Sequence, residues 1–160
     1  MGNAECCEEG EAEGDPDMST DPKTVKRVHG KIDRCLYWHG GLPFEKHQAT
    51  MKSSCERTLE QVTRILKRYP AVGVKIIGYT GEMPKDEAMR LSRDRCQAVK
   101  DALHRMNSEN LIAIRGMGYA DKIGPRIEIV PCEPKEVSLF LAEMQSAERS
   151  CTSPASCNQQ

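Results

Sequence analysis

Apolar and polar residues alternate along most of the chain with one of two periods, and the period changes several times. Steps of three and four residues predict amphipathic helices, and strict alternation predicts strands. A short apolar run that ends at two glycines predicts one further strand, the first. The predicted helices begin at Cys55, Pro84 and Pro134, and the predicted strands cover residues 32–38, 72–79, 111–116 and 126–130.

These elements follow the order strand, helix, strand, helix, strand, strand, helix. Strands that are joined through helices run parallel, and a final pair of consecutive strands runs antiparallel. We therefore expect an α/β fold, a two-layer sandwich with a β-α-β-α-β-β mixed sheet of about four strands. The helices cover one face, and a C-terminal helix follows. The folded domain is expected over residues 28–145.

The two ends of the chain differ from this body in composition. Residues 1–24 are acidic, and residues 146–160 are small and polar, so we expect both to be disordered tails. The formal net charge of the chain is -1, but residues 1–22 hold eight Asp and Glu and no Lys or Arg. The remaining 138 residues therefore carry +7. The near-neutral average conceals an acidic tail and a mildly basic domain.

Composition also excludes several classes of function. No apolar run reaches the length of about 18 residues that a membrane span requires, and the start lacks the apolar stretch of a secretory signal, so we expect a cytosolic chain. The basic body lacks the interleaved aromatic residues typical of nucleic-acid binding. We expect the eight cysteines to be free thiols. Cys35, His39 and His47 match no familiar zinc spacing, so neither a metal site nor a cofactor is predicted.

Four blocks of sequence carry the most specific signal: VKIIGYTG at 74–81, LSRDRCQAV at 91–99, RGMGY at 115–119 and RIEI at 126–129. In this order and spacing they resemble the OmpA-like domain, the module with which bacterial outer-membrane proteins, peptidoglycan-associated lipoproteins and flagellar stators hold the cell wall. The similarity spans residues 30–131, and LPF at 42–44 with ATMK at 49–52 looks like the first strand of that family and the entry to its first helix.

The resemblance implies a binding site that contains one acidic and one basic side chain. In the family, an Asp contacts the ammonium group of diaminopimelate in a peptidoglycan stem peptide, and an Arg contacts its carboxylate. Here Arg95 fills the Arg position, whereas Gly81 replaces the Asp. The candidate ligand-binding residues of this degenerate site are Arg95, Thr80, Gly81, Glu82 and Arg126.

Two interpretations of Arg95 remain open. In the first, the guanidinium only covers the core and donates hydrogen bonds to the carbonyl groups around residues 78–81, and the module is a non-catalytic docking or scaffold domain. In the second, Arg95 still binds a peptidoglycan stem peptide, with Glu82 as a substitute carboxylate, or with Asp86 or Asp94 as the acid that pairs with Arg95 instead. No pair of nucleophile and base suggests an enzyme. The expected partners are an unidentified protein or a ligand that bears a carboxylate.

The first residues suggest a lipid anchor. Gly2 is placed for N-myristoylation, and Cys6 and Cys7 for palmitoylation, although the usual Ser or Thr is missing at position 6. One myristoyl chain binds membranes only marginally, and the acidic tail cannot serve as a basic second signal, so acylated cysteines would have to supply it. This predicts attachment to the cytoplasmic face of a membrane. Incorporation of a clickable myristate analogue that Gly2→Ala does not abolish would contradict it.

Overall fold

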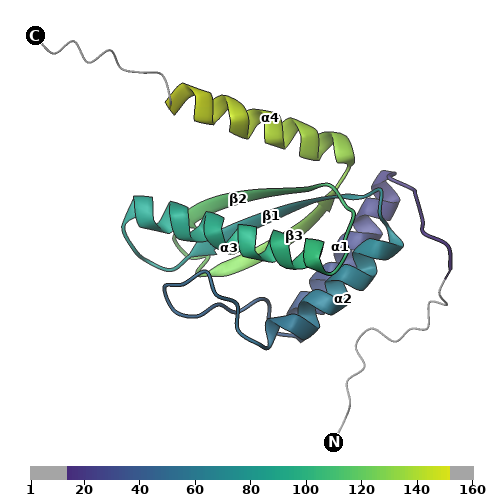
Figure 1. The fold of residues 1–160 in the computed structure, drawn as a ribbon, viewed down its shortest axis with the longest axis horizontal. Helices are drawn as coiled ribbons and strands as arrows, with labels where there is room; N and C mark the ends of the chain where they lie inside the picture. Colours follow the sequence, from purple (N-terminus) through teal and green to yellow (C-terminus); the bar gives the residue numbers. More distant parts are fainter. Residues whose placement is uncertain (1–13, 152–160) are drawn as a thin grey trace, which may run out of the picture.

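The computed structural model describes residues 14–151 (Figure 1). Three strands form one mixed sheet in the order β2-β1-β3, with β1 parallel to β2 and antiparallel to β3. The α/β class, the mixed sheet, the covering helices and the C-terminal helix are therefore confirmed. The elements are α1 (Pro22–Trp38), α2 (Cys55–Arg68), β1 (Gly73–Thr80), α3 (Lys85–Arg105), β2 (Ile112–Tyr119), β3 (Arg126–Cys132) and α4 (Pro134–Cys151).

The predicted first strand is wrong, because residues 32–38 form the second half of helix α1. Val28, Ile32 and Cys35 follow one another at steps of four and three and are fully buried, which is the spacing of a helix face. The sheet accordingly has three strands among the described residues rather than four. Helix α1 packs against α2 and against β3 (Figure 1).

The predicted tail boundaries also need correction. Helix α1 begins at Pro22 because the Asp21 side chain accepts hydrogen bonds from the backbone N–H groups of Lys23 and Thr24, at 2.9 and 3.1 Å. Thr24 is buried, so residues 22–24 belong to the folded part. At the other end α4 continues through residue 151, beyond the expected limit of 145. Of the two predicted tails, residues 1–13 and 152–160 lie outside the described residues.

The main core lies between the sheet and helices α1, α2 and α3. The predicted apolar face of α2 is confirmed, since Leu59, Val62 and Leu66 are buried there. On β1, Val74 and Ile76 face this core and alternate with residues that face the other side of the sheet. Helix α4 covers part of that other side, where a smaller cluster joins it to β2 and β3 (Figure 1). The members of this cluster are Ala113, Cys132, Val137, Phe140 and Leu141.

Candidate functional site

A cleft of about 390 Å³ lies where β1 ends and β3 begins. The loop after α1, the segment after β1 and helix α3 complete its walls. The structure thus brings four of the five predicted site residues, Arg95, Gly81, Glu82 and Arg126, to one cleft. The other lining residues are Leu42, Pro43, Phe44, Lys46, His47, Tyr79, Met83, Leu91, Pro125 and Ile127.

Arg95 forms the buried part of this cleft, with 7% of its surface exposed. Its Nε donates a hydrogen bond to the carbonyl oxygen of Gln48 at 2.9 Å, and its Nη2 donates to that of Glu45 at 3.2 Å. The guanidinium carbon lies 5.1 Å from the centre of the Phe44 ring, within the range of a cation–π contact. Burial lowers the pKa of Arg95, but a guanidinium starts so high that it stays charged at neutral pH.

Among residues 14–151, no carboxylate lies within ion-pair distance of Arg95. The interpretation in which Arg95 binds the carbonyl groups around residues 78–81 is wrong, because the acceptors belong to Glu45 and Gln48. Two carbonyl dipoles and one aromatic face solvate the cation, but they carry no compensating charge.

The loop that holds Arg95 is a compact turn over residues 44–51. An isolated antiparallel bridge pairs Phe44 with Met51, and the N–H of Glu45 donates to the carbonyl of Thr50 at 2.9 Å. At its tip His47 adopts a φ of 59°, a conformation that few residues other than glycine tolerate. Sequence reasoning assigned parts of this segment to a strand and a helix entry. It missed Glu45 and Gln48 as Arg95 partners, because backbone acceptors leave no signal in a sequence.

The end of β1 supplies the position where the family has its Asp. A Cβ atom built on Gly81 would have no neighbour within 4 Å, so this wall of the cleft is open. Glu82, the next residue, is exposed and lines the cleft. Thr80 differs from its neighbours, because it is fully buried and is not part of the cleft wall. Its Oγ1 has no hydrogen-bond partner among residues 14–151.

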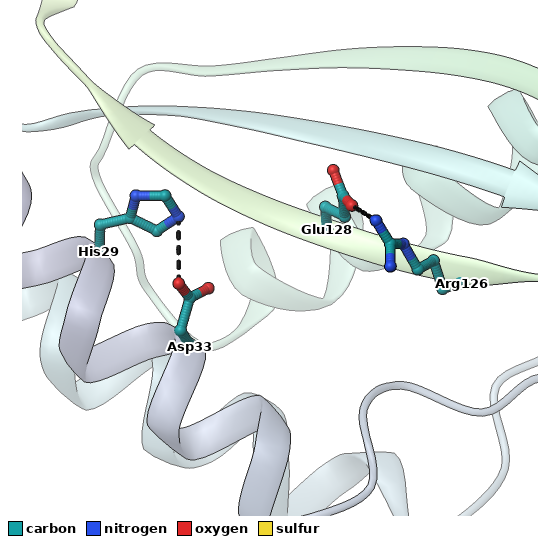
Figure 2. A network of polar contacts seen from close by, with 4 residues as sticks. All are labelled: His29, Asp33, Arg126 and Glu128. Carbon is teal, nitrogen blue, oxygen red and sulfur yellow. Dashed lines mark hydrogen bonds and ion pairs between the residues drawn. The ribbon is translucent and has the colours of Figure 1, made fainter. Parts of the chain in front are cut away.

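Arg126 stands at the rim of the cleft on β3. Its guanidinium pairs with Glu128 on the same strand and lies 5.8 Å from the centre of the Tyr79 ring. Figure 2 shows this pair beside α1, which carries a second polar pair, His29 and Asp33, at 3.3 Å. Glu128 thus compensates the charge of Arg126, in contrast to that of Arg95. With Lys46 also in the wall, the cleft still carries more positive than negative charge.

The residue after Arg95 is Cys96, and its thiol is unreactive. Cys96 is fully buried against the sheet, and burial raises the pKa of its thiol to about 12. A thiol of this kind stays protonated and is a poor nucleophile at neutral pH. Within residues 14–151, no group of His, Cys, Asp and Glu side chains is arranged to hold a metal ion. The helices of that range are also too short or too polar to cross a bilayer.

No protein-family model matches this sequence. The solved periplasmic domain of Helicobacter pylori MotB superimposes with a TM-score of 0.51 at 17% identity, over 69% of this chain and 81% of that one. The solved OmpA-like domain of FopA1 from Francisella tularensis superimposes with a TM-score of 0.50 at 24% identity, over 57% of this chain and 70% of that one. The chain has the fold of an OmpA-like domain. The predicted resemblance is confirmed at this level.

The chain is also similar in sequence to one protein of known description. The chain is 37% identical over 82 residues to a protein of Escherichia coli K12 that is described as the probable lipoprotein YiaD. The match covers 50% of this chain and 37% of the lipoprotein, so the chain spans well under two thirds of that relative.

These comparisons overturn the predicted location at the cytoplasmic face of a membrane. The proteins to which this chain is similar include a probable lipoprotein and a periplasmic domain, and these point to the periplasmic side. The prediction failed because it used a short N-terminal pattern with an imperfect match, whereas the fold comparison spans most of the chain. The acylation sites themselves, Gly2, Cys6 and Cys7, lie outside the described residues and stay a prediction.

Proposed function

We propose that this chain is a non-catalytic binding module whose cleft holds a carboxylate of a peptidoglycan stem peptide. The proposal rests on one observation about Arg95. This residue is 93% buried at the cleft, and its guanidinium has no carboxylate partner among the described residues. Charges inside proteins are normally paired, because the loss of hydration is costly. A ligand carboxylate would supply the missing charge and accept hydrogen bonds from the guanidinium.

The fold and the lipoprotein relative support the peptidoglycan class over other carboxylates. The sequence resemblance implies that the arginine at position 95 contacts the ligand carboxylate. The departure from the family lies at Gly81, where the acidic partner of the ligand ammonium is absent. Glu82 is the acidic residue in the lining of the same cleft, and no described residue forms an ion pair with it, so its carboxylate is the candidate substitute. A membrane-associated chain with such a module would act as a scaffold between membrane and cell wall.

Nuclear magnetic resonance titration of the full chain with the tripeptide L-Ala-γ-D-Glu-meso-diaminopimelate tests this proposal. We expect the backbone amide resonances of Gly81 and Arg95 to shift. We expect Arg95→Lys to weaken binding on the order of tenfold, because an ammonium group lacks the planar pair of donors that matches a carboxylate. Arg93→Lys is the matched control, since Arg93 lies on the same helix but pairs with Glu148 outside the cleft.

Arg95 also anchors the 44–51 loop, so the fold of Arg95→Lys must be checked by its circular dichroism and thermal midpoint. If that variant unfolds, Arg126→Gln at the exposed rim provides a second, weaker reduction of the cleft charge. Absence of any shift at Gly81 and Arg95 at millimolar tripeptide would overturn the proposal. The degenerate-site interpretation, in which the module docks another protein, would then stand in its place.

A further inference from the structure

A second cleft, of about 620 Å³, adjoins the first one. The two clefts share four lining residues, His47, Glu82, Met83 and Leu91, so they form one continuous groove along helix α3. The residues that line only the second cleft are Ala49, Pro84, Glu87, Arg90 and Asp94.

The two ends of this groove have opposite charge. The first cleft holds the buried guanidinium of Arg95 together with Lys46 and Arg126. The second holds the carboxylates of Glu87 and Asp94, with Arg90 as the cation in its lining. Glu82 lies at the junction. Neither Glu87 nor Asp94 forms an ion pair with a residue in the range 14–151.

The helix explains why these charges are separated and yet share one groove. Glu87, Leu91 and Asp94 stand at positions i, i+4 and i+7 of α3, which places them on one face of the helix. Seven residues of helix span about 10 Å. The row of carboxylates therefore starts one residue before Arg95 and extends about two turns toward the start of α3. Leu91 forms an apolar wall between the acidic positions.

We propose that this groove binds a peptide whose carboxylate and ammonium groups are several bonds apart, with the carboxylate at Arg95 and the ammonium between Glu87 and Asp94. The inference rests on the proposed function and specifies the ligand of the same site. Diaminopimelate carries its free ammonium and one of its carboxylates on a single carbon atom, and this pair suits an acid directly beside the arginine. With Gly81 at that position, the carboxylates in the groove are that of Glu82, at the junction, and those of Glu87 and Asp94, on α3. A stem peptide that ends in lysine has the same five-carbon spacing between its ammonium and its terminal carboxylate as diaminopimelate. It lacks the second carboxylate beside the ammonium, which Glu87 and Asp94 would repel, so it matches this arrangement better.

Isothermal titration calorimetry of the full chain with two peptides tests the inference. The probes are L-Ala-γ-D-Glu-L-Lys and the same peptide with its lysine amine acetylated. We expect the free amine to bind about 3- to 10-fold more tightly, as two partly exposed ion pairs would provide. This preference should shrink as salt is added, because exposed charges are screened.

Substitutions on α3 locate the source of the preference. In the double variant Glu87→Gln/Asp94→Asn the two peptides should bind equally, whereas Asp86→Asn should keep the native preference. Asp86 is the matched control because it is exposed, adjacent in sequence and absent from both clefts. All three residues are exposed, so the folded structure should be preserved.

The outcomes separate the two proposals. If the native chain binds a stem peptide through Arg95 but does not distinguish the free from the acetylated lysine, the inference about the second cleft is overturned and the proposed function stands. The same holds if the double variant keeps the preference. If neither the lysine peptide nor the diaminopimelate peptide binds, both proposals are overturned.

Discussion

The two sides of helix α3 differ in how much space they leave for a side chain at the neighbouring glycines. Toward the sheet, a Cβ atom on Gly78 would lie 2.7 Å from the sulfur of Cys96, and one on Gly116 would lie 2.6 Å from both Oγ of Ser92 and the backbone nitrogen of Arg93. Toward the cleft, a Cβ atom on Gly81 would meet nothing within 4 Å. One helix thus carries a close-packed interface on one side and borders an open cleft on the other.

Adjacent residues of α3 illustrate the same contrast. Cys96 is a fully buried neutral thiol on the sheet side, and Arg95 is a buried cation that reaches the cleft. On the sheet side, the Oγ of Ser92 accepts a hydrogen bond from the N–H of Gly118 and donates one to the carbonyl of Met89, at 3.0 Å in both cases. Stability should therefore depend mainly on the sheet side and ligand choice mainly on the cleft side, so that substitutions can change one property without the other.

The largest expected effect is on the sheet side. Gly116→Ala should lower the free energy of unfolding by about 3 kcal/mol, because the new methyl group would overlap backbone atoms of α3 that cannot move without shifting the helix. Urea denaturation followed by circular dichroism measures this loss.

Gly81→Ala is the control for that substitution, because it adds the same methyl group on the cleft side. Its unfolding free energy should stay within about 0.5 kcal/mol of the native value. Equal losses of unfolding free energy in the two variants would contradict the difference between the two sides of α3. They would show that the space around the two glycines does not govern the effect of the substitution.

A smaller effect is expected when an acidic residue is returned to the cleft. Gly81→Asp should raise the affinity for the diaminopimelate tripeptide on the order of tenfold, because it restores an acid beside Arg95 and a charge-assisted hydrogen bond contributes about 1.5 to 3 kcal/mol. Calorimetric titration measures the gain. Gly81→Asn, which has the same shape without the charge, should show little of it.

Gly81→Asp also tests whether the position of the acid selects between the two peptides. The gain should be smaller for the lysine peptide, whose ammonium is placed farther along α3. The free energy of unfolding should be close to the native value, because the side chain enters open space. If Gly81→Asp and Gly81→Asn have the same affinity for the diaminopimelate tripeptide, charge at this position does not control ligand choice.

Periodicity predicted the elements that have one clear pattern, and it failed where two patterns coincide. Helices α2 and α3 and the three strands of the sheet were predicted near their observed bounds. Residues 32–38 contain a short apolar run that suits a strand, while Val28, Ile32 and Cys35 suit a helix. A run of this length is ambiguous by itself. The Asp21 side chain caps the start of helix α1, but Asp21 lies in the segment that we interpreted from composition as an acidic tail.

The sequence by itself determined the amphipathic segments, the position of a charge at Arg95 inside the apolar face of α3, and the absence of an acid at Gly81. These are local properties, because each depends on residues within a few turns of one another. Only the tertiary structure decided which groups surround that charge. The carbonyl groups of Glu45 and Gln48 approach Arg95 from about 50 residues away, and the two clefts join because the 44–51 loop packs beside α3. Contacts between distant backbone atoms depend on how the elements pack, and no local pattern encodes them.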